Sequence, residues 1–117
     1  MASRISFNSG WALEECLDVQ MVHTMAPYAR IMVVEATSAS FVALNNAVTY
    51  AVNNGANIIT MSYGASEFSG QNLYNTVYTN NQVCYLASSG DSTATVEVPS
   101  SYPNVMSVGG TSLYLDA

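Results

Sequence analysis

Short apolar runs of strand length alternate with helical segments along this chain, and no other feature constrains the fold as strongly. Segments 10–25 and 40–53 are predicted helices, and 71–79 is a weaker helix prediction. The apolar runs are hydrophobic throughout rather than at every second residue, which is typical of strands in a buried parallel sheet. The predicted strands are residues 31–36, 57–62, 82–87 and 104–108.

This alternation predicts an α/β fold with three layers, in which helices cover both faces of a mostly parallel sheet. Ser9 is the expected N-cap of the first helix, Pro27 ends that helix, and Gly55 follows the second one. In such sheets ligands bind beyond the carboxyl ends of the strands. The loops after Ser62 and Ala87 are therefore the first places to look for chemistry.

The chain is poor in charge. Of its 117 residues 50% are hydrophobic and 9% are charged, whereas about 25% is usual in soluble domains. Such a chain is expected to form one domain with a hydrophobic core. Most of its helices and strands are then buried within that domain or pack against further residues of a longer chain. Lysine is absent, and Arg4 and Arg30 face eight carboxylates, which gives a net charge of -6. This balance argues against a nucleic-acid partner and is compatible with an acidic environment.

No segment is long and apolar enough to span a bilayer, so no membrane association is expected. Residues 1–10 lack the apolar core of a secretory signal, and the localisation stays open. Cys16 and Cys84 lie in apolar runs and are predicted to be buried free thiols, although a disulfide between them is the alternative. Their spacing fits no metal motif, and no metal is assigned to this chain.

Glu14 and Asp18 stand four residues apart, so a helix places them on one face, which continues as Met21 and Met25. Two close carboxyls share a proton, and such a pair could act as a general base toward a hydroxyl nucleophile even in acid. The simpler interpretation is that Glu14, Glu15 and Asp18 favour the positive end of the helix. Spacing alone favours the simpler interpretation.

Asp91 follows the third predicted strand in the run L-A-S-S-G-D-S, after a glycine that permits a tight turn. A protonated carboxyl there could donate a hydrogen bond to a developing oxyanion. An aspartate that binds its own turn backbone is the simpler interpretation, and the loop alone favours it.

Several stretches, taken in order, resemble the sedolisin (serine-carboxyl peptidase) family. They are W-A-L-E-E-C-L-D-V-Q-M-V-H-T-M-A-P, I-M-V-V-E-A, A-V-T-Y-A-V-N-N-G-A-N-I-I-T-M-S-Y-G, L-A-S-S-G-D-S and Y-P-N-V-M-S-V-G-G-T-S-L, and the resemblance runs from about residue 10 to residue 113. The resemblance implies a subtilisin-like fold, with residues 1–117 forming part of one peptidase domain. It also implies that Glu14 and Asp18 are the catalytic acid pair and that Asp91 stabilises the oxyanion.

The same resemblance implies an endopeptidase that acts on proteins or peptides through an acyl-enzyme at acidic pH. Its nucleophilic serine would lie outside this chain, which by itself is then expected to be inactive. The calcium site of the family is likewise expected in a C-terminal part of the domain, and that part is also a candidate partner. Family members work outside the cell or in acidic compartments.

Two further residues invite a catalytic role that the resemblance does not support. His23 lies on the helix side opposite Glu14 and is predicted to be packed and hydrogen-bonded. Ser112 stands in G-G-T-S-L, but the family's nucleophile opens a helix, whereas L-Y-L-D-A follows here. Ser112 is therefore predicted to be a strand-end serine. Thr93 replaces the glycine that often follows S-G-D-S in the family, which leaves the loop shape around Asp91 open.

Two other functions are compatible with the residues. The first is a non-catalytic remnant that binds peptides or assembles with a partner through an exposed sheet edge. The second is an unrelated flavodoxin-like or regulator-like α/β domain. That fold would place a phosphate-binding or flavin-binding loop after the first strand, and A-T-S-A-S offers no glycine-rich cradle there.

Overall fold

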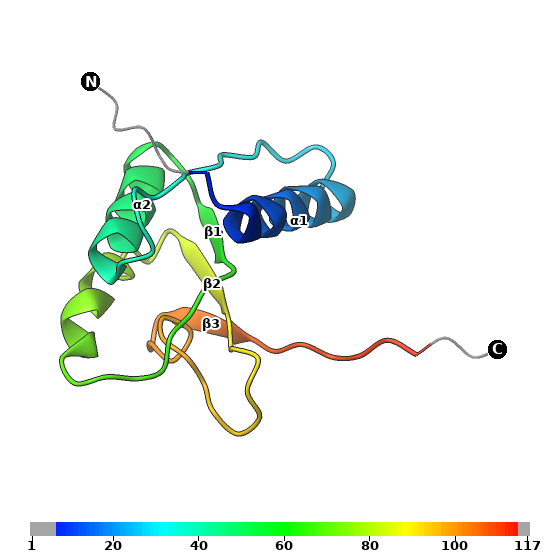
Figure 1. The fold of residues 1–117 in the computed structure, drawn as a ribbon. Helices are drawn as coiled ribbons and strands as arrows, with labels where there is room; N and C mark the ends of the chain where they lie inside the picture. Colours follow the sequence, from blue (N-terminus) through cyan, green and yellow to red (C-terminus); the bar gives the residue numbers. More distant parts are fainter. Residues whose placement is uncertain (1–6, 115–117) are drawn as a thin grey trace. The chain divides into compact units, whose positions relative to one another are not determined.

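A computed structural model describes residues 7–114, which divide after Ala56 into two units, called unit 1 (residues 1–56) and unit 2 (residues 57–117) (Figure 1). Unit 1 contains the helices α1 (Ser9–Met25) and α2 (Phe41–Asn53). Unit 2 contains the strands β1 (Ile58–Met61), β2 (Cys84–Ser88) and β3 (Val105–Val108) and the 3-10 helix η1 (Gln71–Val77). Within the described residues, neither α-helix has the length and hydropathy to cross a membrane.

The residue that caps the start of helix α1 is Asn8 and not the expected Ser9. Asn8 has an extended backbone, with φ -131° and ψ 117°. Its Oδ1 therefore turns back and accepts hydrogen bonds from the N–H groups of Gly10 (3.0 Å) and Trp11 (3.1 Å). Ser9 is already helical and cannot fill that role. The end of α1 at Met25 agrees with the stop predicted from Pro27.

Helix α2 confirms the second predicted helix at both ends. Ser40 caps its start, because Ser40 Oγ accepts the N–H of Ala43 at 3.3 Å. Gly55 follows its end with a φ of +89°, a left-handed conformation that glycine adopts without steric cost.

The segment 31–36, predicted as the first strand, forms no strand. Ile31, Met32 and Val33 are 39%, 45% and 49% exposed. An apolar run becomes a strand only where a neighbouring backbone takes up its hydrogen bonds. The described part of unit 1 holds helices alone, so the run finds no such neighbour there.

The other three predicted strands are confirmed, and they pair in parallel in the order β1-β2-β3 (Figure 1). Ile59 lies opposite Tyr85, and Tyr85 opposite Val105, so these side chains share one face and are buried. On the other face Ile58 remains 67% exposed and Met106 58% exposed. The described sheet therefore packs on one face, although its strands are apolar on both.

Both cysteines are free, but the prediction that they are buried is wrong, because both are exposed. Cys84 lies opposite Ile58 on the open face of the sheet, and Cys16 lies on α1, which has no buried residue. An apolar neighbourhood in the sequence did not indicate which face of its element a thiol occupies.

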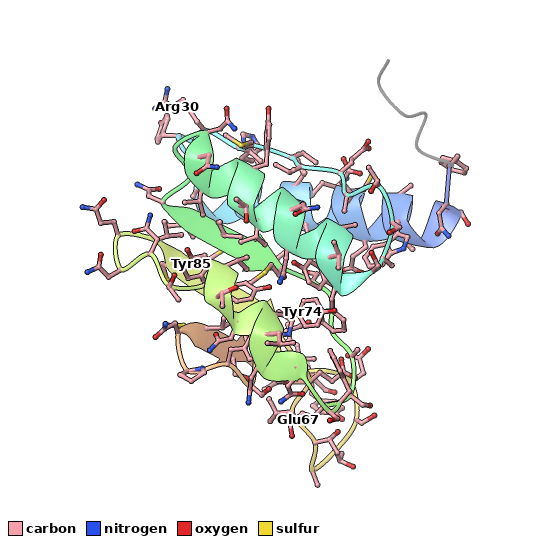
Figure 2. The ribbon with its side chains drawn as sticks, turned by 90° about the vertical axis from the view of Figure 1, so that its left-hand side faces the viewer. Arg30, Glu67, Tyr74 and Tyr85 are labelled. Atoms are coloured by element: carbon pink, nitrogen blue, oxygen red, sulfur yellow. The ribbon has the colours of Figure 1, made fainter. Side chains whose placement is uncertain are left out.

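Tyrosines form the centre of the unit 2 core. The ring of Tyr78 meets that of Tyr85 edge-on with centroids 5.4 Å apart, and that of Tyr102 at 5.6 Å. The hydroxyl of Tyr102 donates to the carbonyl of Gln71 at 2.8 Å, and that of Tyr85 to the carbonyl of Val77 at 3.3 Å. Figure 2 labels Tyr74 on η1 and Tyr85 on β2. These contacts fasten η1 to β2 and to the segment before β3.

The Tyr102 hydroxyl supplies the first test of this core. Tyr102→Phe removes the donor to Gln71 and should lower the free energy of unfolding by about 1 kcal/mol, since the carbonyl of Gln71 loses its partner. Urea unfolding measures the loss. Tyr28→Phe makes the same chemical change at a residue that is 99% exposed and should be neutral. Equal effects of the two variants would contradict the assigned hydrogen bond.

Alkaline titration supplies the second test. Burial raises the pKa of Tyr63 from 10.0 to about 12, although a hydrogen bond from Tyr78 partly opposes this. Since the folded-state pKa is raised, this contribution to stability is complete below about pH 10 and is lost as the pH rises toward about 12. Tyr63→Phe should make unfolding less steep with pH across that window. The same slope in the wild type and in Tyr63→Phe would contradict the raised pKa of Tyr63.

Candidate active site

The predicted acid pair lies on α1, one helical turn apart. Glu14 and Asp18 are both half-buried. Their apolar neighbours Leu13 and Leu17 are 73% and 52% exposed. An ordinary solvated acidic stripe would show the opposite order, with carboxylates outermost and leucines inside. The helix therefore holds these two acids closer to the rest of the protein than its two leucines.

His23 is exposed near the end of α1, so the prediction that it is packed is wrong. The physical reason is that α1 buries none of its residues within the described chain.

Asp91 lies just beyond the carboxyl end of β2, as the sequence predicts. Strand β2 ends at Ser88, and Gly90 turns the chain with a φ of +101°. The side chain of Asp91 is exposed at the start of the loop that leads toward β3, drawn in yellow and orange in Figure 1. Ser89, two residues earlier, donates its N–H to the carbonyl of Val108 at 2.8 Å. The start of this loop is thus anchored to β3.

Ser112 lies beyond the end of β3 at Val108, in a segment without regular structure up to residue 114, and it is exposed. In the described residues it does not open a helix. The structure places Glu14 and Asp18 together on α1, whereas Asp91 and Ser112 belong to unit 2. The catalytic assignments of Glu14, Asp18 and Asp91 remain predictions.

The structure also draws attention to carboxylates that sequence reasoning did not select. Glu15 and Glu35 both line a cavity of about 640 Å³ within unit 1. Its other lining residues are Val33, Val34, Ala36, Thr37, Ala43, Asn46, Ala47 and Tyr50. In unit 2 the Glu97 side chain lies against Gly64 and Gly90. The sequence pattern that could have pointed to these glutamates is the position of each one inside or beside an apolar run.

Within residues 7–114 no group of three or more histidine, cysteine, aspartate or glutamate side chains is placed to hold a metal ion. The resemblance places the calcium site of the family in a C-terminal part of the domain, and that expectation stays a prediction.

The three-stranded parallel sheet and the helices define an α/β fold, in which Asp91 follows the carboxyl end of β2. The sequence model of the subtilase family matches residues 1–114, and the chain belongs to this family, whose members are serine peptidases. Among solved structures, 28 chains match. One is the structure of the prenylagaramide maturation protease PagA, with a TM-score of 0.50 and 31% sequence identity.

The match to PagA covers 66% of this chain and 30% of the PagA chain, so the chain spans less than a third of that relative's length. No curated protein sequence matches it.

The cap of α1 supplies a test of how the acid pair is positioned. Asn8→Ala removes the acceptor for two N–H groups and should cost about 1 kcal/mol of helix stability. Faster amide hydrogen exchange in the first turns of α1 measures this loss. Ser9→Ala changes the neighbouring residue without removing the cap and should leave the exchange rates unchanged. The reverse order of effects would identify Ser9 as the cap.

Proposed function

We propose that this chain is part of the catalytic domain of a sedolisin-type serine-carboxyl endopeptidase, which cleaves peptide bonds in proteins or peptides through an acyl-enzyme. The observation that carries this proposal is the half-buried pair Glu14 and Asp18 on α1, beside leucines that are more exposed. Membership of the subtilase family supports the serine-peptidase part of the proposal. The sedolisin part rests on the residue types at positions 14, 18 and 91.

In the proposed reaction Glu14 accepts the proton of a serine hydroxyl while the serine oxygen attacks the carbonyl carbon of the scissile bond. Asp18 orients Glu14 and, by sharing one proton with it, keeps a usable base available in acid. Asp91, in its protonated form, donates a hydrogen bond to the oxyanion. Glu14 then returns the proton to the leaving amine, and it activates the water that hydrolyses the acyl-enzyme.

In this scheme the nucleophilic serine comes from chain outside these residues, and Ser112 is not the nucleophile. Ser112 is exposed and opens no helix within the described residues, which supports this part of the proposal. Calcium, where the family requires it, would likewise be held by other residues.

A non-catalytic module that binds a peptide or assembles with a partner is the second candidate, and one observation favours it. Within unit 2 one face of the sheet is packed, while Ile58 and Met106 on the other face are 67% and 58% exposed. That face could receive another chain, including a C-terminal part of the same domain. The two candidates differ in whether the protein turns over substrate.

Asp91 gives the sharpest test of the catalytic proposal, made in the full-length protein encoded by the gene. Asp91→Ala removes the oxyanion donor and should lower kcat by about 10²–10³-fold. Asp91→Asn keeps a donor that needs no protonation, so it should retain more activity and extend it to higher pH. Hydrolysis of a casein-derived peptide from pH 3 to pH 8 measures both. Glu67→Gln, at an exposed carboxylate outside the proposed machinery, is the control.

The 117-residue chain alone should show no turnover in the same assay. Turnover that Ser112→Ala abolishes would instead make Ser112 the nucleophile. If the full-length protein binds peptides without cleaving them at any pH, the non-catalytic module is the correct function.

A further inference from the structure

Glu97 is held at the carboxyl ends of two neighbouring strands by its backbone. Its N–H donates to the carbonyl of Ser89, in the loop after β2, at 3.0 Å. The next residue, Val98, exchanges two hydrogen bonds with Ala65, in the loop after β1, at 2.9 Å and 3.1 Å. Val98 is fully buried. The position of Glu97 is therefore fixed relative to both loops.

The Glu97 side chain lies over two glycines, one from each loop. A Cβ atom added to Gly90 would stand 2.7 Å from Glu97 Cδ and 3.1 Å from Oε2, and one added to Gly64 would collide with Oε2. Gly90 also has a positive φ, whereas at Gly64 the close neighbours of an added Cβ are the Oε2 and Cβ atoms of Glu97. Both loops thus leave room for this carboxylate, which is half-buried.

The Glu97 carboxylate lacks a countercharge in its own unit. Residues 57–117 contain no lysine, arginine or histidine. The described residues give its side chain no hydrogen bond, although its backbone carbonyl accepts from Ser100 Oγ at 2.8 Å and from the N–H of Ser101 at 3.0 Å. A partly buried carboxylate is stabilised when a cation with matching donors pairs with it.

The site is next to the residue that would bind the reacting carbonyl. Asp91 directly follows Gly90, and the Glu97 side chain occupies the space that a side chain at position 90 would need. If Asp91 donates to the oxyanion, the nearest substrate side chain belongs to the residue that carries that carbonyl, on the N-terminal side of the scissile bond. Ligands of parallel α/β sheets bind at this end of the strands.

We propose that the Glu97 carboxylate, held over Gly64 and Gly90, binds the cationic side chain of an arginine or lysine on the N-terminal side of the cleaved bond. This inference rests on the proposed peptidase function for the bond that is cut. The preference for a cationic side chain rests on Glu97 and the two glycines. An arginine fits best, because its guanidinium donates two parallel hydrogen bonds to one carboxylate.

Binding to the 117-residue chain tests the cation site without requiring catalysis. The probe is the peptide acetyl-Ala-Ala-Arg-amide, with citrulline in place of arginine as a neutral match of the same shape. The arginine peptide should shift the amide NMR signals of Gly64, Gly90 and Glu97 and bind at least about tenfold more tightly than the citrulline peptide. Glu97→Gln should abolish this difference, whereas Glu67→Gln should preserve it.

Equal affinity for the two peptides, no binding by the folded chain, or an unchanged arginine preference in Glu97→Gln would overturn the proposal. A Glu97 side chain that merely fills space would favour small residues instead. In that case Glu97→Gly, and not Glu97→Gln, would change which peptides bind.

Cleavage by the full-length protein provides the second measurement and separates this inference from the proposed function. The ratio of kcat/KM for arginine over alanine at the N-terminal side of the cleaved bond should fall at least about tenfold in Glu97→Gln and stay constant in Glu67→Gln. Cleavage with no such preference contradicts the cation site and leaves the peptidase intact. Arginine binding that depends on Glu97, in a protein that cleaves nothing, contradicts the peptidase and leaves the cation site intact.

Discussion

The backbone hydrogen bonds of residues 97 and 98 hold together the end of unit 2 where chemistry is expected. Parallel pairing brings the carboxyl ends of β1 and β2 to the same edge of the sheet, but it does not fix the loops that follow. The bonds from Glu97 to Ser89 and between Val98 and Ala65 do that. They join loops that lie far apart in the sequence, so the positions of Gly64 and Gly90 depend on one short stretch of chain.

The buried residues that follow explain why this stretch can bear that role. Val98 is fully buried, and Pro99 and Ser100 are also buried. Tyr102 then joins the aromatic cluster of Tyr78 and Tyr85 under the sheet. The loop that carries Glu97 is therefore anchored in the core by the residues that follow Glu97, whereas Glu97 itself is partly exposed. A binding side chain on such a support keeps its geometry better than one on a free loop.

The sequence predicted the elements better than it predicted their surroundings. Apolar runs located β1, β2 and β3 to within about two residues, because an apolar run of strand length is the main local signal for a strand of a parallel sheet. The run at 31–36 carried the same signal and failed, since pairing depends on a neighbour that composition does not reveal. The prediction that Cys84 is buried was wrong for a related reason, because its exposure follows from the sheet face that it shares with Ile58.

Among the residues of the candidate site, Asp91 could be located from the sequence, because it follows a strand and a glycine at close spacing. Glu14 and Asp18 could be placed because one helix carries both. Glu97 could not, since its significance comes from its closeness to Gly64 and Gly90, which no local pattern encodes. Long-range contacts of this kind have no periodicity to read, and a glycine alone has several possible reasons.

The distribution of charge connects these acids. The chain has eight carboxylates, two arginines and no lysine, and residues 57–117 have no basic side chain at all. The negative charge of a carboxylate in unit 2 can be neutralised by a proton or by a cation from outside the unit. Protonation and cation binding suit different positions. Asp91 is exposed beside a turn and, in the proposed reaction, works in its protonated form. Glu97 is half-buried against two glycines. In the proposed binding site its ionised carboxylate pairs with the guanidinium of a substrate arginine, because charge-assisted hydrogen bonds are stronger than neutral ones. In the two proposals, one acid of unit 2 thus serves catalysis and another serves substrate selection.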